Sequence, residues 1–365
     1  MIPMNGFQRE PEALRQRELA AVERVLRSGW YILGQEVRAF EAEWALAIGT
    51  NHVVGVGNGM DAIEIGLRAL GIGPGDEVVT TPMTAFASAL AIIRAGAQPV
   101  LADIDPATAQ MSIGSAKRCL SNRTRAILLV HLYGQANELE GWKKFCDDAG
   151  VYLVEDCAQA HLASWNGIRA GAYGKLGAFS FYPTKNLGAV GDGGALTTSD
   201  EAIALKARQL RNYGQSDRYH HPVLGLNSRL DELQAAILRV RLTVLEEFTE
   251  RRRTIARAYR SGIANPAIRL LATPAQESSH VYHLFVLCCD QRQRLAEHLN
   301  AWGVESLIHY PIPVHQQPPC TGLRRDPAGL RAAEIHGGTC LSIPCHPQLT
   351  DAEVASVIRA LNEFG

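Results

Sequence analysis

A single lysine, Lys185, stands in a stretch whose composition suits covalent chemistry. Residues 176–195 read LGAFSFYPTKNLGAVGDGGA, so small and aromatic residues precede the amine and several glycines follow it. Glycine lets a backbone turn tightly and pass close to a bulky group. A lysine held among apolar residues is poorly solvated, which lowers the pKa of its amine and favours the neutral form that condenses with an aldehyde. We interpret Lys185 as the attachment point of an aldehyde cofactor; taken alone, a surface lysine in a glycine-rich loop is the alternative.

A carboxylate upstream, Asp156, fits the same chemistry. It ends the run VYLVED (151–156), which places it at the carboxyl edge of a central strand, where ligands bind in open α/β sheets. A pyridine ring that accepts electrons must keep its nitrogen protonated, and a neighbouring carboxylate does this. The pair therefore favours pyridoxal phosphate, although an acid at the end of a strand is by itself more often a helix cap.

A phosphate site is indicated where a strand gives way to a helix near residue 59. Backbone amides at the start of a helix bind phosphate, and Gly59 and Met60 are the candidate donors. Ser180 is a candidate hydroxyl for the same phosphate, or else a satisfied strand serine. The spacing G-x-G-x-x-G of a dinucleotide site is not met, because Asp61 and Ala62 follow Gly59.

Composition excludes several classes of partner. The 365 residues carry 36 basic and 37 acidic side chains, and a formal charge of -1 gives no field for nucleic acid or an anionic membrane. The eight cysteines show no paired C-x-x-C spacing, so neither a disulfide framework nor a metal site is indicated. No apolar run is long enough to cross a bilayer. We expect a cytoplasmic protein with reduced cysteines that acts on a small molecule.

The elements that position these residues alternate between strand and helix in the first 211 residues. Apolar runs separated by amphipathic stretches predict an α/β fold with a mostly parallel sheet covered by helices. We expect strands at 52–56, 77–80, 99–103, 126–132, 151–155, 178–181 and 195–198, and helices at 10–28, 37–48, 61–70, 86–95, 140–149 and 200–211.

The second part of the chain predicts a smaller α+β domain. Residues 229–263 read as one helix of roughly 50 Å, at ~1.5 Å per residue, that joins two domains. A strand at 281–288, a helix at 292–302, a strand at 305–310, a proline-rich loop at 311–327 and two helices follow. We place the large domain at 1–255, with an amino-terminal helix that packs on the small domain, and the small domain at 256–365.

Two groups of polar residues are candidate substrate contacts. His309, Tyr310 and His315 lie in IHYPIPVH, a proline-stiffened loop suited to a cleft between domains; histidines bonded to backbone carbonyls are the alternative. Arg218 and His220, with His221, lie in a polar stretch that suits a sugar or its diphosphate, or else forms a solvated loop.

The ordered motifs resemble the nucleotide-sugar aminotransferases of the DegT and StrS type, which are fold type I pyridoxal phosphate enzymes. The resemblance runs from about residue 25 to the carboxyl terminus. Its motifs are GNGMDA (57–62), GIGPGDEVVTTP (71–82), VHLYGQ (130–135), EDCAQAH (155–161), FSFYPTKNLGAVGDGGA (179–195), RNYG (211–214), GLNSRLDELQAA (225–236) and HVYHLFV (280–286).

The resemblance implies a role for each matching position. It implies Lys185 as the Schiff-base lysine, Asp156 at the pyridine nitrogen and Gln159 near the ring hydroxyl. It implies a homodimer with shared active sites, in which Asn227 of one subunit reaches the phosphate of the other. At the phosphate it places Gly59, Met60 and Ser180.

One position departs from the family pattern. An aromatic residue that stacks on the cofactor usually follows the threonine of the TP-x-T stretch directly. Here Ala85 follows Thr84, and Phe86 comes one residue later. Phe86 is therefore the candidate for stacking in a shifted register, with absence of stacking as the alternative.

The function that these features predict is amino transfer from L-glutamate to a keto-sugar carried on dTDP or UDP. The GNGMDA and VHLYGQ forms resemble the branch that acts on 3-keto sugars, in amino-sugar, O-antigen or polysaccharide biosynthesis; a 4-keto substrate is the alternative. A regulatory homologue without turnover, a sugar dehydratase and a nicotinamide-dependent dehydrogenase are the rivals. Lys185 argues against the dehydratase, which carries histidine there, and the missing glycine fingerprint argues against the dehydrogenase.

Overall fold

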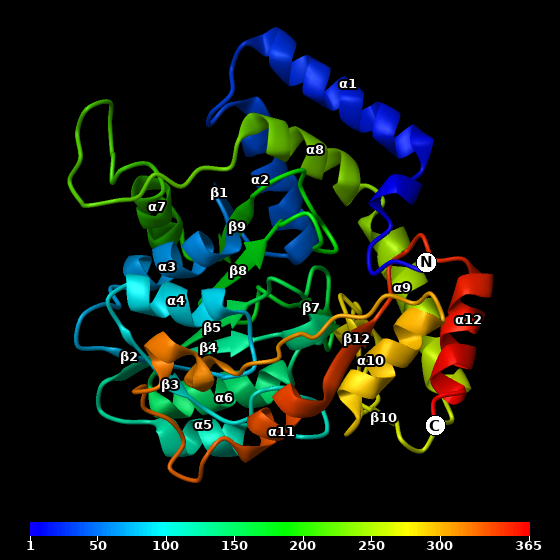
Figure 1. Ribbon diagram of the computed structural model, residues 1–365. Helices are drawn as coiled ribbons and strands as arrows, with labels where there is room; N and C mark the ends of the chain where they lie inside the picture. The colour runs from blue at the N-terminus through cyan, green and yellow to red at the C-terminus, as the bar shows by residue number, and fades with distance from the viewer.

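A seven-stranded sheet forms the centre of the computed structural model, which describes residues 1–365 (Figure 1). Its strands are β1 His52–Val56, β2 Glu77–Thr80, β3 Gln98–Leu101, β4 Thr124–Val130, β5 Tyr152–Asp156, β8 Leu176–Ser180 and β9 Gly194–Thr198. They lie in the order β1-β9-β8-β5-β4-β2-β3. β9 is antiparallel to both of its neighbours, and the other neighbouring pairs are parallel. The predicted α/β fold with a mostly parallel sheet is confirmed.

Helices cover both faces of this sheet. Successive residues of a strand point to opposite faces, so Ile127 joins one buried apolar cluster and Leu128 the other. The first cluster is packed by α2 Gln35–Ile48, α5 Ile113–Cys119, α6 Leu139–Ala149 and α8 Glu232–Leu242. The second is packed by α3 Gly59–Ala69, α4 Phe86–Arg94 and α7 Glu201–Leu210. Burial on both faces explains why these strands read as continuous apolar runs.

The long helix predicted over 229–263 is wrong, because the structure has two helices there. α8 ends at Leu242, and α9 spans Leu245–Gly262. Thr243 closes α8 by donating from its hydroxyl to the carbonyl of Val240 at 2.7 Å, and both residues between the helices are β-branched. Such local hydrogen bonding competes with helix continuation, so the chain changes direction here without proline or glycine.

A smaller sheet lies in the carboxyl-terminal part of the chain. It consists of β10 Arg269–Leu270, β11 Phe285–Cys288 and β12 Cys340–Ile343, all antiparallel, with α9, α10 Arg292–Ala301 and α12 Asp351–Asn362 packed around it. The predicted strand at 305–310 is wrong: only Leu307 makes a bridge, to Ser342. The strand β12 was not predicted; it lies between the two carboxyl-terminal helices, where the sequence shows no separate strand signal.

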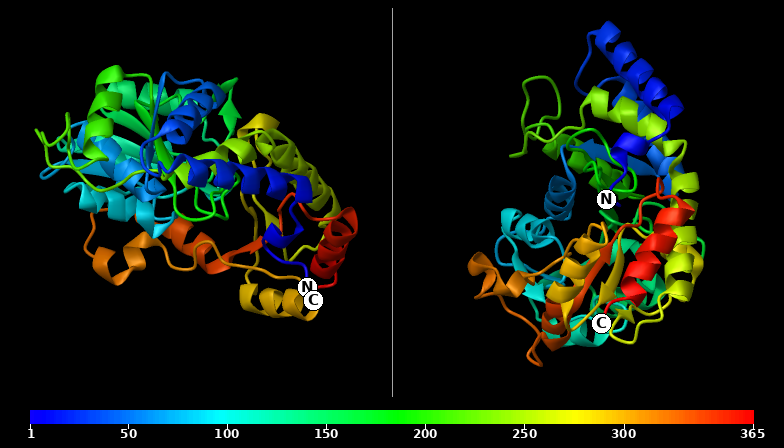
Figure 2. Two further views of the ribbon diagram at one scale, coloured as in Figure 1. Left: turned by 90° about the horizontal axis from the view of Figure 1, so that it is seen from above. Right: turned by 45° about the vertical axis from the view of Figure 1, so that its right-hand side comes forward.

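The two ends of the chain tie its parts together. α1 Glu12–Ser28 packs on α8, and the residues before it reach the carboxyl-terminal part, where Arg9 pairs with Glu353 at 2.6 Å (Figure 2). The segment before α11 Arg331–Thr339 runs beside β3, where the amide of Leu101 donates to the carbonyl of Arg324 at 3.0 Å. Two-residue strands β6 Ser164–Trp165 and β7 Ile168–Arg169 form a separate hairpin. None of the helices has the length and apolar character that a bilayer crossing requires.

Candidate active site

Asp156 is the last residue of β5, the middle strand of the large sheet, and its carboxylate is buried at the carboxyl edge. Its Oδ2 accepts a 2.7 Å hydrogen bond from the hydroxyl of Ser88, whose oxygen in turn lies 2.8 Å from that of Thr84. Its Oδ1 accepts from the amide of Ala158 at 3.1 Å. Fixed donors on one side orient the carboxylate, as a group that must face a cofactor nitrogen requires.

Lys185 lies in the loop after β8 and is half-buried. Burial lowers the pKa of this amine to about 8, against the opposing effect of the Asp156 carboxylate. The loop turns tightly: the Lys185 amide donates to the carbonyl of Tyr182 at 2.8 Å, and a Cβ on Gly188 would lie 2.3 Å from the carbonyl oxygen of Pro183. The glycine at this position is therefore required by the turn that presents the lysine.

Three histidines surround the amine. Burial lowers the pKa of His161 to about 3 and that of His309 to about 4, and the nearby charge of Lys185 acts in the same direction. The pKa of His283 is lowered well below its usual range for the same two reasons, in that order. The imidazoles around the amine are therefore neutral at physiological pH. They add no positive charge to the site.

His161 has hydrogen-bonding capacity that the protein does not use. Both of its ring nitrogens are buried without a partner, while its ring packs among Trp44, Phe179 and Phe181 at centroid distances of 5.7–5.9 Å. Buried polar atoms in native proteins are nearly always satisfied. An unsatisfied ring near Lys185 fits a site built for another polar group.

The predicted phosphate residues come together at the opposite end of the site. α3 begins at Gly59, so the amides of Gly59 and Met60 have no intrahelical acceptor. A Cβ added to Gly59 would lie 2.6 Å from Cβ of Ser180, so only glycine allows this approach. Asn58 caps the helix by accepting from the amide of Asp61 at 2.8 Å. Two amides and a hydroxyl thus converge at a helix start, which suits a phosphate.

Gln159 is held in one orientation between two tyrosines. Its Oε1 accepts a 2.6 Å hydrogen bond from the amide of Tyr133, and its Nε2 donates to the hydroxyl of Tyr310 at 3.1 Å. Burial, followed by the Asp156 charge, raises the pKa of Tyr310 to about 12. Tyr310 therefore belongs to the site as a neutral hydroxyl, as does His309, whose Nδ1 lies 2.9 Å from the hydroxyl of Ser342.

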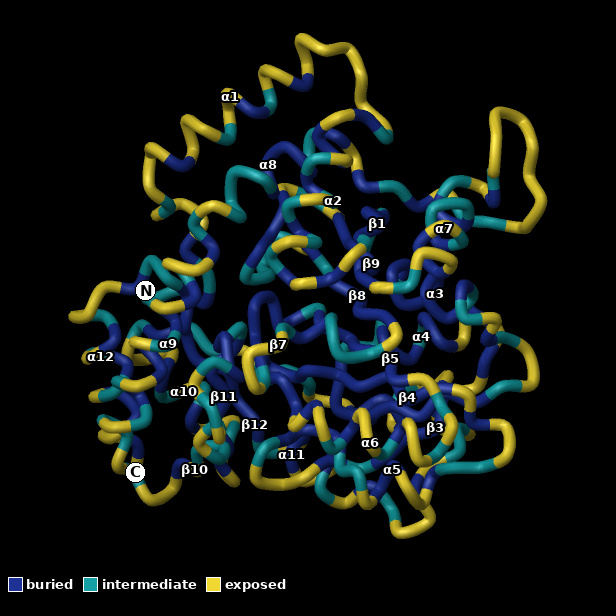
Figure 3. Tube along the Cα trace, turned by 180° about the vertical axis from the view of Figure 1, so that it is seen from behind, coloured by how far each residue is buried: buried dark blue, intermediate teal, exposed yellow.

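Other predicted residues lie apart from Lys185 within one chain. His315 is buried and faces α11, with its Nε2 3.0 Å from Glu334. Phe86, the first residue of α4, packs against a small apolar cluster that contains Val314. Arg218 and His220 lie in the exposed loop between α7 and α8 (Figure 3).

Asn227, predicted to reach across a dimer, is also in the α7–α8 loop. It is exposed and bridges to Asn212. Its side chain makes no hydrogen bond within the chain.

Four residues of the site were not singled out from the sequence. Ser88 bonds Asp156 from α4, and Thr84, just before that helix, bonds Ser88. The sequence places both residues far from β5. His283 lay within a quoted motif, HVYHLFV, and Tyr133 within another, VHLYGQ, so motif membership was the available signal. Their roles depend on contacts between segments that only the fold brings together.

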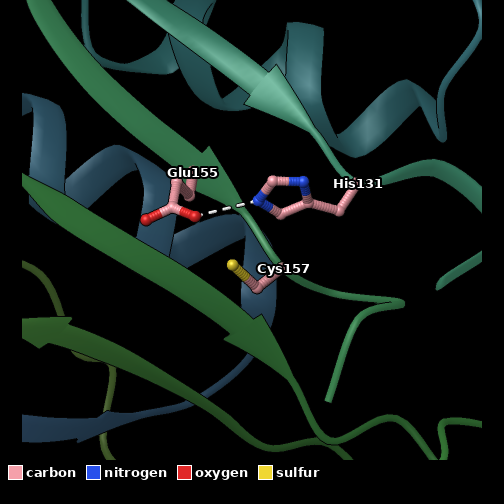
Figure 4. A group of neighbouring side chains, drawn as sticks. All are labelled: His131, Glu155 and Cys157. Carbon is pink, nitrogen blue, oxygen red and sulfur yellow. Dashed lines mark hydrogen bonds and ion pairs between the residues drawn. The ribbon is translucent and has the colours of Figure 1, made fainter. Parts of the chain in front are cut away.

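A buried cluster behind the site is structural. His131, Glu155 and Cys157 lie within one group on and beside β5 (Figure 4), and His131 Nε2 lies 2.9 Å from Glu155. Glu155 also accepts from the amides of residues 171, 173 and 174 at 2.8–3.0 Å. With four donors this carboxylate is satisfied without an ion. Because neighbours on a strand point to opposite faces, Glu155 anchors β5 from behind while Asp156 faces the site.

The fold and this site define a class of protein: a fold type I pyridoxal phosphate enzyme. The residues fit the cofactor because they include a low-pKa lysine, a buried carboxylate at the end of a central strand, an unsatisfied imidazole and a phosphate cradle at a helix start.

Comparison with known proteins identifies the family. The DegT/DnrJ/EryC1/StrS aminotransferase family profile matches residues 12–362, and the chain belongs to this family. It is 43% identical over 364 residues to the dTDP-3-amino-3,4,6-trideoxy-alpha-D-glucose transaminase of Streptomyces venezuelae, covering 100% of this chain and 96% of that protein. It is 43% identical over 351 residues, 96% of each chain, to the dTDP-3-amino-3,6-dideoxy-alpha-D-galactopyranose transaminase of Aneurinibacillus thermoaerophilus.

A solved structure agrees with this assignment. The crystal structure of S. venezuelae DesV in complex with a ketimine intermediate superposes with a TM-score of 0.96 at 43% identity, covering 99% of this chain and 98% of that one. The protein is therefore a sugar aminotransferase that depends on pyridoxal phosphate.

Proposed function

We propose that this enzyme transfers the amino group of L-glutamate to the 3-keto group of a 6-deoxy or related hexose carried on dTDP or UDP. The products are 2-oxoglutarate and a 3-amino nucleotide sugar. The observation that carries the proposal is the low-pKa amine of Lys185 beside the buried carboxylate of Asp156. The choice of C-3 is supported by two relatives named as 3-amino-sugar transaminases.

The cofactor, when bound, supplies a carbonyl that takes up the amino group and a ring that accepts an electron pair. Lys185 would hold it covalently, and Asp156 would keep a proton at its ring nitrogen. Gly59, Met60 and Ser180 would bind its phosphate, and Gln159 would lie near its hydroxyl. Hydrogen bonds from the protein already orient Asp156 and Gln159 for these roles.

Lys185 also serves as the proton carrier once its nitrogen is free. With a pKa of about 8, Nζ is partly unprotonated near neutral pH, so it accepts a proton as a base and returns it as an acid. Both roles need one group close to two carbon atoms, which a lysine on a fixed turn provides. The surrounding histidines stay neutral and leave this task to the amine.

The substrate side of the site is proposed to include His309 and Tyr310. Tyr310 is fixed by Gln159, so its hydroxyl occupies a defined place near Asp156. Phe86 and His315 remain predictions for cofactor stacking and substrate contact, since each packs elsewhere in the free chain.

We propose a homodimer in which the α7–α8 loop enters the partner's site. The loop is exposed, and Leu224 within it is 91% exposed. Asn227 would reach the cofactor phosphate, and Arg218 and His220 would meet the sugar diphosphate. The remaining proposals are a large domain at 1–255, a small domain at 256–365, a cytoplasmic location and a role in O-antigen or polysaccharide biosynthesis.

The function is tested with purified enzyme, L-glutamate and a panel of 3-keto and 4-keto hexoses on dTDP and UDP. Mass spectrometry should detect an amino sugar only from 3-keto substrates, with one 2-oxoglutarate formed for each. Amination of the 4-keto series alone would assign the alternative substrate, and amination of none would reject the proposal.

A further inference from the structure

Two cysteines lie opposite each other in the small sheet. Cys288 ends β11 and Cys340 begins β12, and the register of the two antiparallel strands pairs them directly. The adjacent pair is hydrogen-bonded, since the amide of Cys289 donates to the carbonyl of Thr339 at 3.0 Å. Hydrogen-bonded and non-hydrogen-bonded pairs alternate, so Cys288 and Cys340 form a non-hydrogen-bonded pair with Cα atoms about 4.5 Å apart. That separation lies within the range of about 4.4–6.8 Å that a disulfide spans.

A histidine of α11 contacts one of these thiols. Nδ1 of His336 lies 3.7 Å from Sγ of Cys288. The hydroxyl of Tyr133 donates its proton to the carbonyl of His309 at 2.6 Å, so its oxygen accepts from Nε2 of His336 at 2.8 Å. Burial lowers the pKa of His336 to about 4, so the ring is neutral and carries its single proton on Nε2. Nδ1 is therefore an unprotonated nitrogen that faces the thiol.

A small molecule can reach Cys288 but not Cys340. Cys288 is 9% exposed, whereas Cys340 is fully buried. Cys288 and His336 line an open pocket of about 400 Å³, whose other walls include β10, α11 and residues 106–107. A water molecule takes up roughly 30 Å³, so a compound a little larger than water fits this pocket easily. The pocket therefore leads to one thiol, with the second thiol behind it.

We propose that Cys288 and Cys340 are a site of reversible oxidation, at which a hydroperoxide converts the two thiols to a disulfide. Nδ1 of His336 takes the proton from Cys288, whose sulfur attacks the hydroperoxide, breaks its O–O bond and becomes a sulfenic acid. The proton then passes to the departing oxygen. Cys340 attacks the sulfenic sulfur, the S–S bond forms, and the hydroxyl leaves with the Cys340 proton as water. The thiols lose two electrons, which reduce the hydroperoxide to an alcohol and water, and neither step involves the cofactor or a sugar.

The environment of the thiols explains why a base is needed. Burial raises the pKa of Cys288 and raises that of Cys340 to about 11, so both thiols are protonated at neutral pH. The thiolate is the reactive form of cysteine. Oxidation therefore depends on proton transfer to His336 and should be slower than that of an exposed, acidic thiol.

The experiment treats the purified holoenzyme with hydrogen peroxide and maps its cysteines. Trypsin places Cys288 in peptide 270–292 and Cys340 in peptide 332–359. Mass spectrometry without reduction should find these two peptides joined, and dithiothreitol should separate them. Each peptide contains a second cysteine, so fragment ions are needed to assign the bond. Because this measurement uses the wild-type chain, it does not depend on the folding of any variant.

Single variants test the role of each residue. Cys340→Ala lacks the second thiol, so sulfenic acid should persist at Cys288 and be labelled by dimedone. Cys288→Ala should give neither the label nor the joined peptides. His336→Gln should slow the oxidation of Cys288 at least about 10-fold, because the base is lost. Cys289→Ala is the matched control: Cys289 follows Cys288 but points to the opposite face of the sheet, so this variant should form the bond like the wild type.

Several outcomes would overturn the proposal. One is the absence of joined peptides after prolonged treatment with excess peroxide, and another is a bond made by Cys289 or Cys345 instead. A dimedone label on Cys340 in the Cys288→Ala variant would reverse the order of attack and also reject it. Purified protein that holds one zinc ion per chain on the two thiols would assign a metal site in its place. Disulfide formation by an enzyme that aminates no sugar would uphold the oxidation site and reject only the proposed function.

Discussion

The hydroxyl of Ser88 donates a 2.7 Å hydrogen bond to Oδ2 of Asp156, joining α4 to the carboxyl end of β5. Removing one donor from a buried carboxylate costs about 1–3 kcal/mol. Ser88→Ala should therefore weaken pyridoxal phosphate binding about 10-fold or more, because the carboxylate is less well oriented toward the cofactor. Equilibrium dialysis of the cofactor measures this.

The control is Ser88→Thr, which keeps the hydroxyl. It should retain most of the cofactor affinity. If both variants bind the cofactor like the wild type, the hydrogen bond does not support the site.

The amine of Lys185 should titrate near pH 8 in the cofactor-free protein. Burial lowers its pKa from 10.5 to about 8, so below this pH the amine is protonated and cannot attack an aldehyde. The rate of covalent attachment of added pyridoxal phosphate should rise with pH and level off above about 8. Stopped-flow absorbance across pH 6–10.5 records the profile.

Asp156→Asn tests the direction in which the Asp156 charge shifts the pKa of Lys185. The Asp156 charge raises the pKa of Lys185, so its removal should move the midpoint to lower pH. A midpoint that stays near 10.5 in the parent protein would contradict the buried position of the amine.

Tyr133 joins the site to α11 and to the loop that carries His309 through its hydroxyl. The oxygen lies 2.6 Å from the carbonyl of His309, to which it donates, and 2.8 Å from Nε2 of His336. Tyr133→Phe leaves buried polar atoms unpaired and should lower the free energy of unfolding by about 1–3 kcal/mol. Urea denaturation measures it.

The matched control for Tyr133 is Tyr152→Phe. Tyr152 is 40% exposed, so its substitution should stay within about 0.5 kcal/mol. Equal effects in the two variants would contradict the role of the Tyr133 hydroxyl.

Gly59 should not tolerate a side chain. A Cβ there would lie 2.6 Å from Cβ of Ser180, and the start of α3 would have to move. Gly59→Ala should weaken binding of the cofactor phosphate about 10-fold or more, since both donors shift. Gly73→Ala, where the nearest atom is an ordinary 3.5 Å away, should bind the cofactor normally.

Regular features of the fold could be predicted from the sequence, and contacts between distant segments could not. The strands of the large sheet are buried on both faces, so continuous apolar runs mark them. β12 was not predicted because it follows α11 directly, at Cys340, with no turn between the two elements. The break at Thr243 was missed because it rests on a side-chain hydrogen bond rather than on glycine or proline.

The same distinction applies to the site. Lys185, Asp156 and the Gly59 turn stand out because their chemistry needs particular residue types next to particular elements. Ser88 and His283 are ordinary residues on their own helix or loop. They become part of the site only because α4 and the segment before β11 are packed against β5 and the lysine loop.

The central claim is the covalent bond between Lys185 and the cofactor, and reduction with borohydride tests it most directly. Trypsin normally cleaves after Lys185, but the trapped lysine resists cleavage, so mass spectrometry should find the reduced cofactor on the single peptide 176–206. Cleavage after an unmodified Lys185, with the tag on another lysine or on none, would contradict the account.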